Sequence, residues 1–141
     1  MLAGVSPEYP WQFFFPETQF HLVDSINKKL TVVNEIAASL GLTNITTQHT
    51  RAEDIKNKQF DVIISRAVAP LQDLWRWSKP LIKKNKTAAG IDNPNGLICL
   101  KGGDLAKEIY ESGCKPFIWE IDKIFPEEYF LHKYLLYQPI K

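Results

Sequence analysis

The chain has 141 residues, of which 45% are apolar and 23% charged, and these are ordinary values for one globular domain with a buried core. Lysine and arginine together number 17 against 16 aspartates and glutamates, which excludes a strong overall field for nucleic acid. No long apolar run predicts a membrane span, and two cysteines, Cys99 and Cys114, favour a reducing cytoplasm over a disulfide framework or a metal site.

The first half of the chain predicts strands and helices in alternation. An apolar run at residues 19–25 is typical of a buried strand, and the spacing of apolar residues in 28–42 is typical of a helix that ends at Gly41. A β-branched segment at residues 44–50 indicates a second strand, which leads into the sequence RAED. Residues 60–69 have the clearest buried-strand pattern.

The second half continues the alternation after Pro70. A helix over residues 70–82 is expected to kink or shorten at Pro80, and residues 83–96 have the composition of a loop. The remaining predicted elements are a strand at 97–103, a helix at 104–113 with Asp104 as N-cap and Gly113 as stop, and strands at 116–125 and 129–140.

This order of elements predicts an α/β fold. Strands that alternate with helices of ten to fourteen residues imply right-handed crossovers and a mainly parallel sheet. Only PEE separates the last two predicted strands, so they are expected to form an antiparallel edge. Ligands of such sheets bind at the carboxyl ends of the strands, and these ends carry Asp24, Arg51 to Glu53, Ser65 to Pro70 and Lys101 to Gly103.

Two acidic positions on this rim have both a ligand-binding and a structural interpretation. A carboxylate at Asp24 can accept hydrogen bonds from both hydroxyls of a ribose, or it can cap the helix that begins near Asn27. The amides around Ala52 and Glu53 can contact an adenine edge, but the same residues fit a solvated helical turn with favourably placed acids.

The basic positions likewise have both a ligand-binding and a structural interpretation. Arg66 can bind a carboxylate, a phosphate or a base edge, or it can form an ion pair with Asp24 or Glu53. Lys101 can meet a substrate beside two glycines, or it can be an exposed lysine in a tight turn. A basic patch can meet phosphates or simply favour the end of a helix; its members are Lys79, Lys83, Lys84 and Lys86.

The stretches FHLVDSINKKLTVVNEIAASLGLTNI, RAED, FDVIISRAVAPL and GLICLKGG together resemble the bacterial small-subunit ribosomal RNA methyltransferase G family, also called glucose-inhibited division protein B. The resemblance implies a Rossmann-like methyltransferase fold and methylation of guanine N7 in 16S rRNA of the small ribosomal subunit, with S-adenosylmethionine as cofactor. It places Asp24 at the ribose, Ala52 and Glu53 at the adenine, Arg66 in the cofactor site and Lys101 on the catalytic, substrate side. It implies no metal and no membrane, in a cytoplasmic protein.

Residues 1–15 depart from this resemblance, which leaves 16–141 as a partial methyltransferase domain without the family's first strand and N-terminal helices. The family's loop GxGGGFPGIPLAI is expected just before FPETQFHLVDS. Codons permitted for residues 1–13 can be chosen so that the neighbouring frame spells AGGGFPGIPLAIF. The hypothesis is that this segment is translated out of frame, and codons incompatible with that reading would contradict it.

The altered segment predicts weak cofactor binding. The loop glycines permit positive φ and a close approach of the backbone to the cofactor, whereas Val5 to Glu8 and Pro10 do not reproduce that shape. Two alternatives to an active rRNA enzyme therefore stand: a non-catalytic remnant, or a methyltransferase with a small-molecule substrate. A methylation assay that compares ribosomal subunits with free metabolites as substrates distinguishes a small-molecule methyltransferase from an rRNA enzyme.

Overall fold

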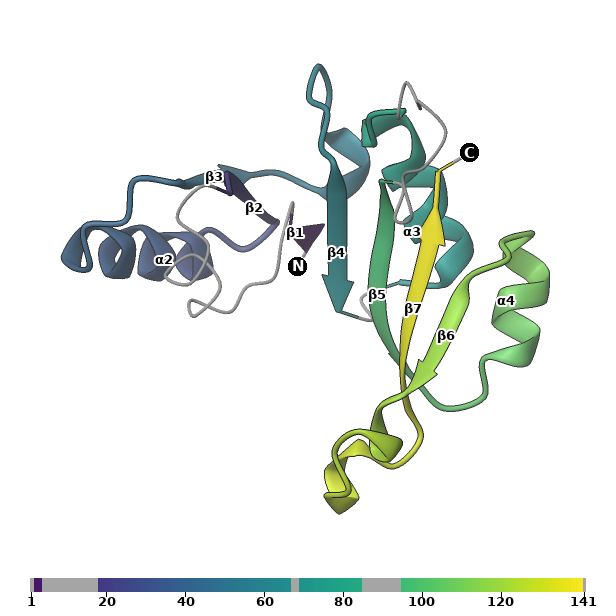
Figure 1. Cartoon of the computed structure of the whole chain (residues 1–141). Helices are drawn as coiled ribbons and strands as arrows, with labels where there is room; N and C mark the ends of the chain where they lie inside the picture. Colours follow the sequence, from purple (N-terminus) through teal and green to yellow (C-terminus); the bar gives the residue numbers. More distant parts are fainter. Residues whose placement is uncertain (1, 4–17, 67–68, 85–94, 141) are drawn as a thin grey trace. The chain divides into compact units, whose positions relative to one another are not determined.

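The computed structural model describes residues 2–3, 18–66, 69–84 and 95–140 (Figure 1). The chain divides into two compact units, Met1–Lys58 and Gln59–Lys141, and each is described by itself. Both units combine strands with helices, as the predicted α/β class requires.

The first unit is built on two parallel strands joined by a helix. Strand β2 (Phe20–Asp24) pairs in parallel with β3 (Ile45–His49), and helix α2 (Asn27–Ser39) makes the crossover between them. A short 3₁₀ helix, η1 (Ala52–Asp54), follows β3. The core of this unit lies between α2 and the strands and contains Phe20, Leu22, Leu30 and Val33, with Ile45 packed against them.

Helix α2 ends as its sequence predicts. Gly41 has a φ of +68°, the left-handed conformation that glycine adopts at low cost, and the amide of Leu42 donates to the carbonyl of Ala37 over 2.9 Å. The apolar spacing overstates how much of the helix is buried, because Ile36 and Leu40 are exposed.

A two-residue strand that was not predicted lies beside β2. Strand β1 (Leu2–Ala3) pairs antiparallel with β2, with Leu2 opposite Val23 and Ala3 opposite Leu22. The other residues of the segment 1–15, which the sequence sets apart, lie outside the described residues.

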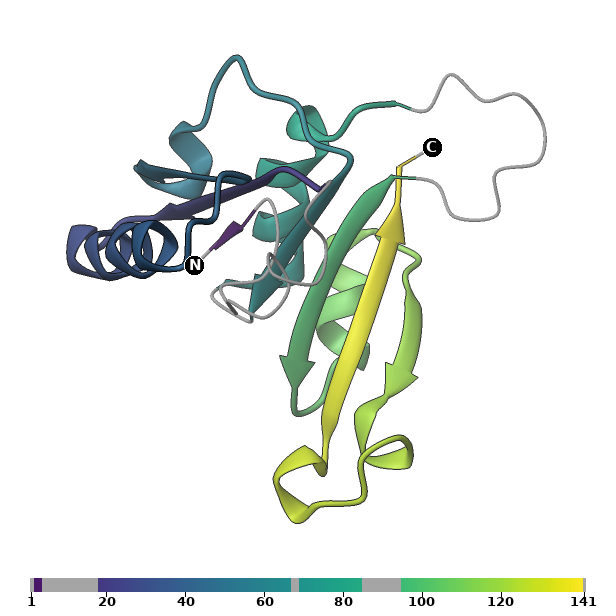
Figure 2. The same ribbon diagram turned by 60° about the vertical axis from the view of Figure 1, so that its left-hand side comes forward.

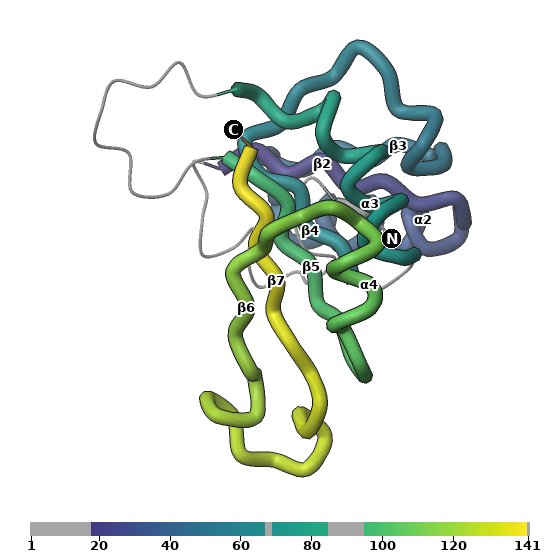
Figure 3. The backbone as a smooth tube through the Cα atoms, turned by 90° about the vertical axis from the view of Figure 1, so that its right-hand side faces the viewer, coloured from purple at the N-terminus to yellow at the C-terminus, as the bar shows by residue number. Residues whose placement is uncertain are grey.

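The described part of the second unit contains four strands with two α-helices on one face. Strand β4 (Val62–Arg66) pairs in parallel with β5 (Gly96–Gly102), and β7 (Lys133–Pro139) pairs antiparallel with both β5 and β6 (Phe117–Glu120). Figure 2 shows β7 between β5 and β6. Helices α3 (Leu71–Ser78) and α4 (Ala106–Ser112) pack against each other on the same side of these strands (Figure 3).

The core of the second unit joins the sheet to helix α3. Ile63, Leu97 and Leu136 on three neighbouring strands are each 1% exposed or less. Leu71 and Leu74 of α3 are fully buried. Apolar burial on this scale is the main favourable term in the folding of the unit.

Several predicted element boundaries in this unit are confirmed. Helix α3 ends at Ser78 and tightens into the 3₁₀ helix η2 (Lys79–Leu81), which contains Pro80. Helix α4 ends at Gly113 with a φ of +68°. The predicted N-cap is wrong, because Leu105 is the N-cap residue and α4 begins at Ala106; the Asp104 carboxylate still accepts the amide of Ala106 over 3.1 Å.

The predicted connection between the last two strands is wrong in length. The strands do pair antiparallel as expected, but they are shorter than predicted and PEE alone does not connect them. Two 3₁₀ helices, η3 (Ile121–Lys123) and η4 (Glu128–Phe130), lie between β6 and β7. The predicted strand at 60–69 is also shorter, because β4 ends at Arg66.

Gly96 is predicted to be the most sensitive glycine of the second unit. A Cβ added there would collide with the main-chain oxygen of Gln138. The same Cβ would lie 2.9 Å from a ring carbon of Tyr137 and 3.0 Å from the Cα of Pro139. We expect Gly96→Ala to lower the free energy of unfolding by more than about 2 kcal/mol, because main-chain atoms of β7 cannot move away independently. Gly113→Ala meets open space and costs only about 1 kcal/mol for its positive φ. Urea denaturation of both variants measures this, and equal losses would contradict the argument.

Cys99 predicts a pH dependence of stability. Burial raises the pKa of this thiol from 9.0 to about 12, against a smaller lowering by the Lys101 ammonium. Above pH 9 the thiol ionises in the unfolded chain but stays protonated in the folded one, so stability falls by up to about 1.4 kcal/mol per pH unit until the folded pKa is reached. Cys99→Ala removes this contribution. The difference in unfolding free energy by which the variant is less stable than the unmodified chain should therefore become smaller between pH 9 and pH 11. Parallel stability profiles for the two proteins would refute the assignment.

Candidate functional site

Asp24 is a buried carboxylate at the carboxyl end of β2. It is 5% exposed, and its Oδ1 accepts the amide of Ile26 over 2.8 Å. Its Oδ2 is buried without a hydrogen-bond partner among the described residues, and the nearest cation, Lys29 Nζ, is 3.9 Å away on a half-exposed side chain. A buried carboxylate oxygen without a hydrogen bond is costly and marks a place where a donor would be stabilised.

The geometry does not support the helix-capping interpretation of Asp24. Oδ1 accepts the amide of Ile26, but Ile26 is itself the N-cap residue of α2, and no side chain caps this helix. The bond to Ile26 uses only Oδ1 and leaves Oδ2 without a hydrogen bond among the described residues. It therefore holds the carboxylate in place and leaves Oδ2 able to accept from a hydroxyl.

The parallel pairing of β2 and β3 places a second segment next to Asp24. His49 lies opposite Asp24 in register, and the amide of Thr50 donates to the Asp24 carbonyl over 3.1 Å. His49 Nε2 donates to the carbonyl of Ser25 over 3.0 Å, which further ties the two strand ends together. The predicted adenine segment follows three residues later.

That segment forms the 3₁₀ helix η1. Ala52 is partly buried and Glu53 is exposed, while Ile55 is buried and anchors the turn. The first amides of a helical turn have no carbonyl partner inside it, so they point free donors outward. The structure thus brings Asp24, Ala52 and Glu53 to neighbouring strand ends of one unit; their contact with an adenosyl group stays a prediction.

Arg66 is the last residue of β4 in the second unit. It is exposed and lies opposite Leu100 of β5 in register. Within the part of this unit that the structure describes, its guanidinium has no carboxylate partner. Its role in a cofactor site, like its alternative pairing with Asp24 or Glu53, stays a prediction.

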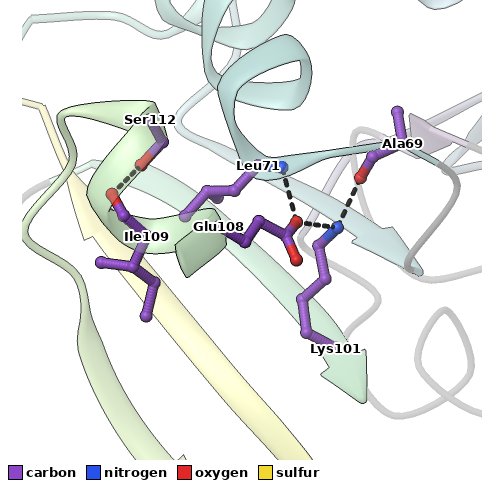
Figure 4. A network of polar contacts seen from close by, with 6 residues as sticks. All are labelled: Ala69, Leu71, Lys101, Glu108, Ile109 and Ser112. Atoms are coloured by element: carbon purple, nitrogen blue, oxygen red, sulfur yellow. Dashed lines mark hydrogen bonds and ion pairs between the residues drawn. The ribbon is translucent and has the colours of Figure 1, made fainter. Parts of the chain in front are cut away.

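Lys101 has an ammonium group with two partners, one just before α3 and one on α4 (Figure 4). Its Nζ donates to the carbonyl of Ala69 and lies 2.6 Å from Oε1 of Glu108. The same oxygen of Glu108 accepts the amide of Leu71 over 2.7 Å. The expectation of an exposed lysine in a tight turn is wrong, because Lys101 is only 6% exposed.

Glu108 is the residue of this network that the sequence did not reveal. It lies on α4, seven positions after Lys101, and its side chain is 25% exposed. The available signal was a lysine near the end of a strand followed by an acid in the next helix, but this spacing is common on solvated surfaces. The predicted substrate-side role of Lys101 is not tested by this geometry and stays a prediction.

The basic patch has local partners at two of its four members. Lys83 lies 3.7 Å from Asp61, and the ammonium of Lys79 lies 5.9 Å from the centre of the Trp75 ring. Lys86 falls outside the described residues. These contacts fit the structural interpretation of the patch and leave phosphate binding a prediction.

Over the described ranges, no helix combines the length and the apolar character needed to cross a bilayer. Among the same residues, no group of three histidine, cysteine, aspartate or glutamate side chains is arranged to hold a metal ion.

Two solved structures share the fold. An rRNA methylase from Streptococcus thermophilus superposes with a TM-score of 0.57 over 84% of this chain and 71% of its own, at 11% identity. A mutant of MtNAS in complex with S-adenosylmethionine superposes with a TM-score of 0.52 over 85% of this chain and 45% of its own, at 12% identity. At these identities the likeness shows a Rossmann-like methyltransferase fold.

Curated relatives are much more similar in sequence. Proteins named ribosomal RNA small subunit methyltransferase G are 44% identical in Phocaeicola vulgatus and 46% identical in Bacteroides thetaiotaomicron, each over 98% of this chain. The chain spans 64% and 65% of the length of these two relatives. The family model for rRNA small subunit methyltransferase G matches residues 3–118, and so runs through part of the segment that the sequence analysis sets apart. On these matches, the chain belongs to the rRNA small subunit methyltransferase G family.

Proposed function

We propose that this chain is the greater part of an enzyme that transfers a methyl group from S-adenosylmethionine to N7 of a guanine in 16S rRNA, in the small ribosomal subunit and in the cytoplasm. Family membership supports the reaction class. The structural observation that carries the proposal is the buried Oδ2 of Asp24 at the carboxyl end of β2, which has no hydrogen bond among the described residues and only a long ion pair with Lys29.

The residues of the first unit fit an adenosyl group. Asp24 offers Oδ2 to a ribose hydroxyl while Oδ1 stays bound to the amide of Ile26. The amides of Ala52 and Glu53, the first two of η1, have no carbonyl partner within this turn, so they suit the acceptors of an adenine edge. Arg66 belongs to the second unit, where it is exposed at the end of β4, and its guanidinium by itself suits a phosphate or a base edge.

The proposed reaction asks little acid–base chemistry of the protein. S-adenosylmethionine supplies an activated methyl group on a sulfonium. Guanine N7 holds a free lone pair, so no general base has to remove a proton. The work of the side chains is then to align the two reactants and to keep water away, and alignment alone accounts for several kcal/mol of a lowered barrier.

The N-terminal segment bears on whether the chain is active as written. It lies largely outside the described residues, and the out-of-frame hypothesis rests on its sequence. We propose that a chain with AGGGFPGIPLAIF in place of residues 1–13 binds the cofactor better than the chain as written. The DNA sequence through codon 15 tests the origin of the segment directly.

Asp24→Asn separates a cofactor role from a structural one. Asparagine keeps the Oδ1 acceptor for Ile26 and removes a buried charge, so stability should stay within about 1 kcal/mol or rise. Affinity for S-adenosylmethionine, measured calorimetrically in the chain carrying the replacement loop, should fall at least about ten-fold, because a neutral amide is a weaker acceptor for a hydroxyl. Asp61→Asn, at an exposed pair, is the matched control and should change neither quantity. Unchanged affinity with Asp24→Asn would remove the ribose assignment.

The identity of the substrate is tested by methyl transfer with two forms of the chain, the chain as written and the chain with AGGGFPGIPLAIF in place of residues 1–13. Small ribosomal subunits lacking the modification and a mixture of free metabolites are each incubated with labelled S-adenosylmethionine. We expect N7-methylguanosine in the 16S rRNA with the replacement loop, and little or no transfer by the chain as written. Transfer to metabolites alone would favour the small-molecule alternative. No transfer by either form would favour a non-catalytic remnant, and micromolar cofactor affinity of the chain as written would overturn the weak-binding prediction.

A further inference from the structure

The contacts of Lys101 and Glu108 converge on the residues that follow Arg66. Lys101 Nζ donates to the carbonyl of Ala69, and Glu108 Oε1 accepts the amide of Leu71 over 2.7 Å. The two side chains are joined to each other over 2.6 Å (Figure 4). One lysine and one glutamate therefore hold both an acceptor and a donor of the main chain where α3 begins.

Helix α3 depends on this contact for its first turn. Its N-cap residue is Pro70, which has no side-chain acceptor, and no side chain of its own caps the helix. The first amides of a helix need partners from elsewhere, and a carboxylate at this end also interacts favourably with the helix dipole. Glu108 supplies that carboxylate from α4, so the cap of one helix comes from its neighbour.

Arg66, which precedes Ala69 by three positions, is held by the sheet. Arg66 is paired in register with Leu100 of β5, and Lys101 is the next residue along that strand. Strand β5 thus holds Arg66 through main-chain pairing and Ala69 through the lysine side chain. One strand, β5, therefore contacts both Arg66 and Ala69.

We propose that Lys101 and Glu108 are positioning residues for Arg66. They fix the start of α3 against β5, so that the guanidinium at the end of β4 loses less freedom when it engages its ligand. This proposal rests on the proposed function for the identity of that ligand. Lys101 acts through the main chain, because its ammonium is enclosed by Ala69 and Glu108 and its side chain is 7% exposed.

The test uses amide hydrogen exchange, which needs neither cofactor nor activity. Lys101→Met and Glu108→Met remove the two contacts, whereas Glu108→Gln keeps an oxygen that can accept from Leu71. We expect exchange at Leu71 to rise at least about ten-fold in both methionine variants, because each loses a hydrogen-bonded contact with a charged group. Exchange at Ile63 and Leu136 in the sheet should change much less, and Glu108→Gln should retain most of the protection at Leu71.

The matched control is Lys107→Met on the same helix. Lys107 is 83% exposed and pairs with Glu111 over 3.8 Å, so its loss should leave Leu71 unchanged. A uniform rise across β4, β5 and β7 in the methionine variants would show a merely structural role and overturn the proposal. An unchanged Leu71 amide would overturn it as well.

A kinetic readout links the network to Arg66. In the form that transfers methyl groups, Glu108→Met should lower kcat/KM, and adding it to Arg66→Ala should cost little more, because both changes act through the same guanidinium. Fully additive losses would overturn the positioning role. If neither form transfers methyl groups, the proposed function fails while hydrogen exchange still decides whether the network holds the start of α3.

Discussion

The buried ammonium of Lys101 imposes a strict local requirement on the second unit. A charged group at 6% exposure costs several kcal/mol unless it is paired and hydrogen-bonded. The chain meets this requirement with a carbonyl from the connection after β4 and a carboxylate from α4. Satisfying one lysine therefore fixes a strand, a helix start and a second helix with respect to one another.

The first unit also buries a charged group, Asp24, but satisfies its hydrogen-bonding capacity only in part. Asp24 is as buried as Lys101, but one of its carboxylate oxygens has no hydrogen bond among the described residues. A buried carboxylate oxygen without a hydrogen bond is costly, and a donor on a bound ligand would remove that cost. The contrast between the two sites explains why Asp24 is assigned to ligand binding and Lys101 to the support of a neighbouring residue.

The sequence predicted the order and type of the elements well, for reasons of periodicity and punctuation. Continuous apolar runs marked the strands, and Gly41, Pro80 and Gly113 marked where helices end or tighten. The predicted connection between β6 and β7 was wrong because η3 and η4 form backbone hydrogen bonds within their own turns. Apolar residues follow directly after them, Ile124 after η3 and Leu131 after η4, and these resemble strand residues by composition. Periodicity also predicted a wider apolar face on α2 than the structure buries, as Ile36 shows.

The candidate site was predicted in part. Residues at strand ends could be named because parallel strands present those ends together. The partners of those residues could not, since the contact between Lys101 and Glu108 depends on how α4 folds back over β5, which no local pattern encodes. The burial of Lys101 was missed for the same reason.

A double-mutant cycle tests the central role of the Lys101–Glu108 contact most directly. The free energy of unfolding is measured by urea denaturation for the chain, for Lys101→Met, for Glu108→Met and for the double variant. We expect a coupling energy above about 1.5 kcal/mol, because either single change leaves a largely buried charge without its partner. Losses that add to within about 0.5 kcal/mol would show that the two side chains act independently and would contradict the structural role assigned to them.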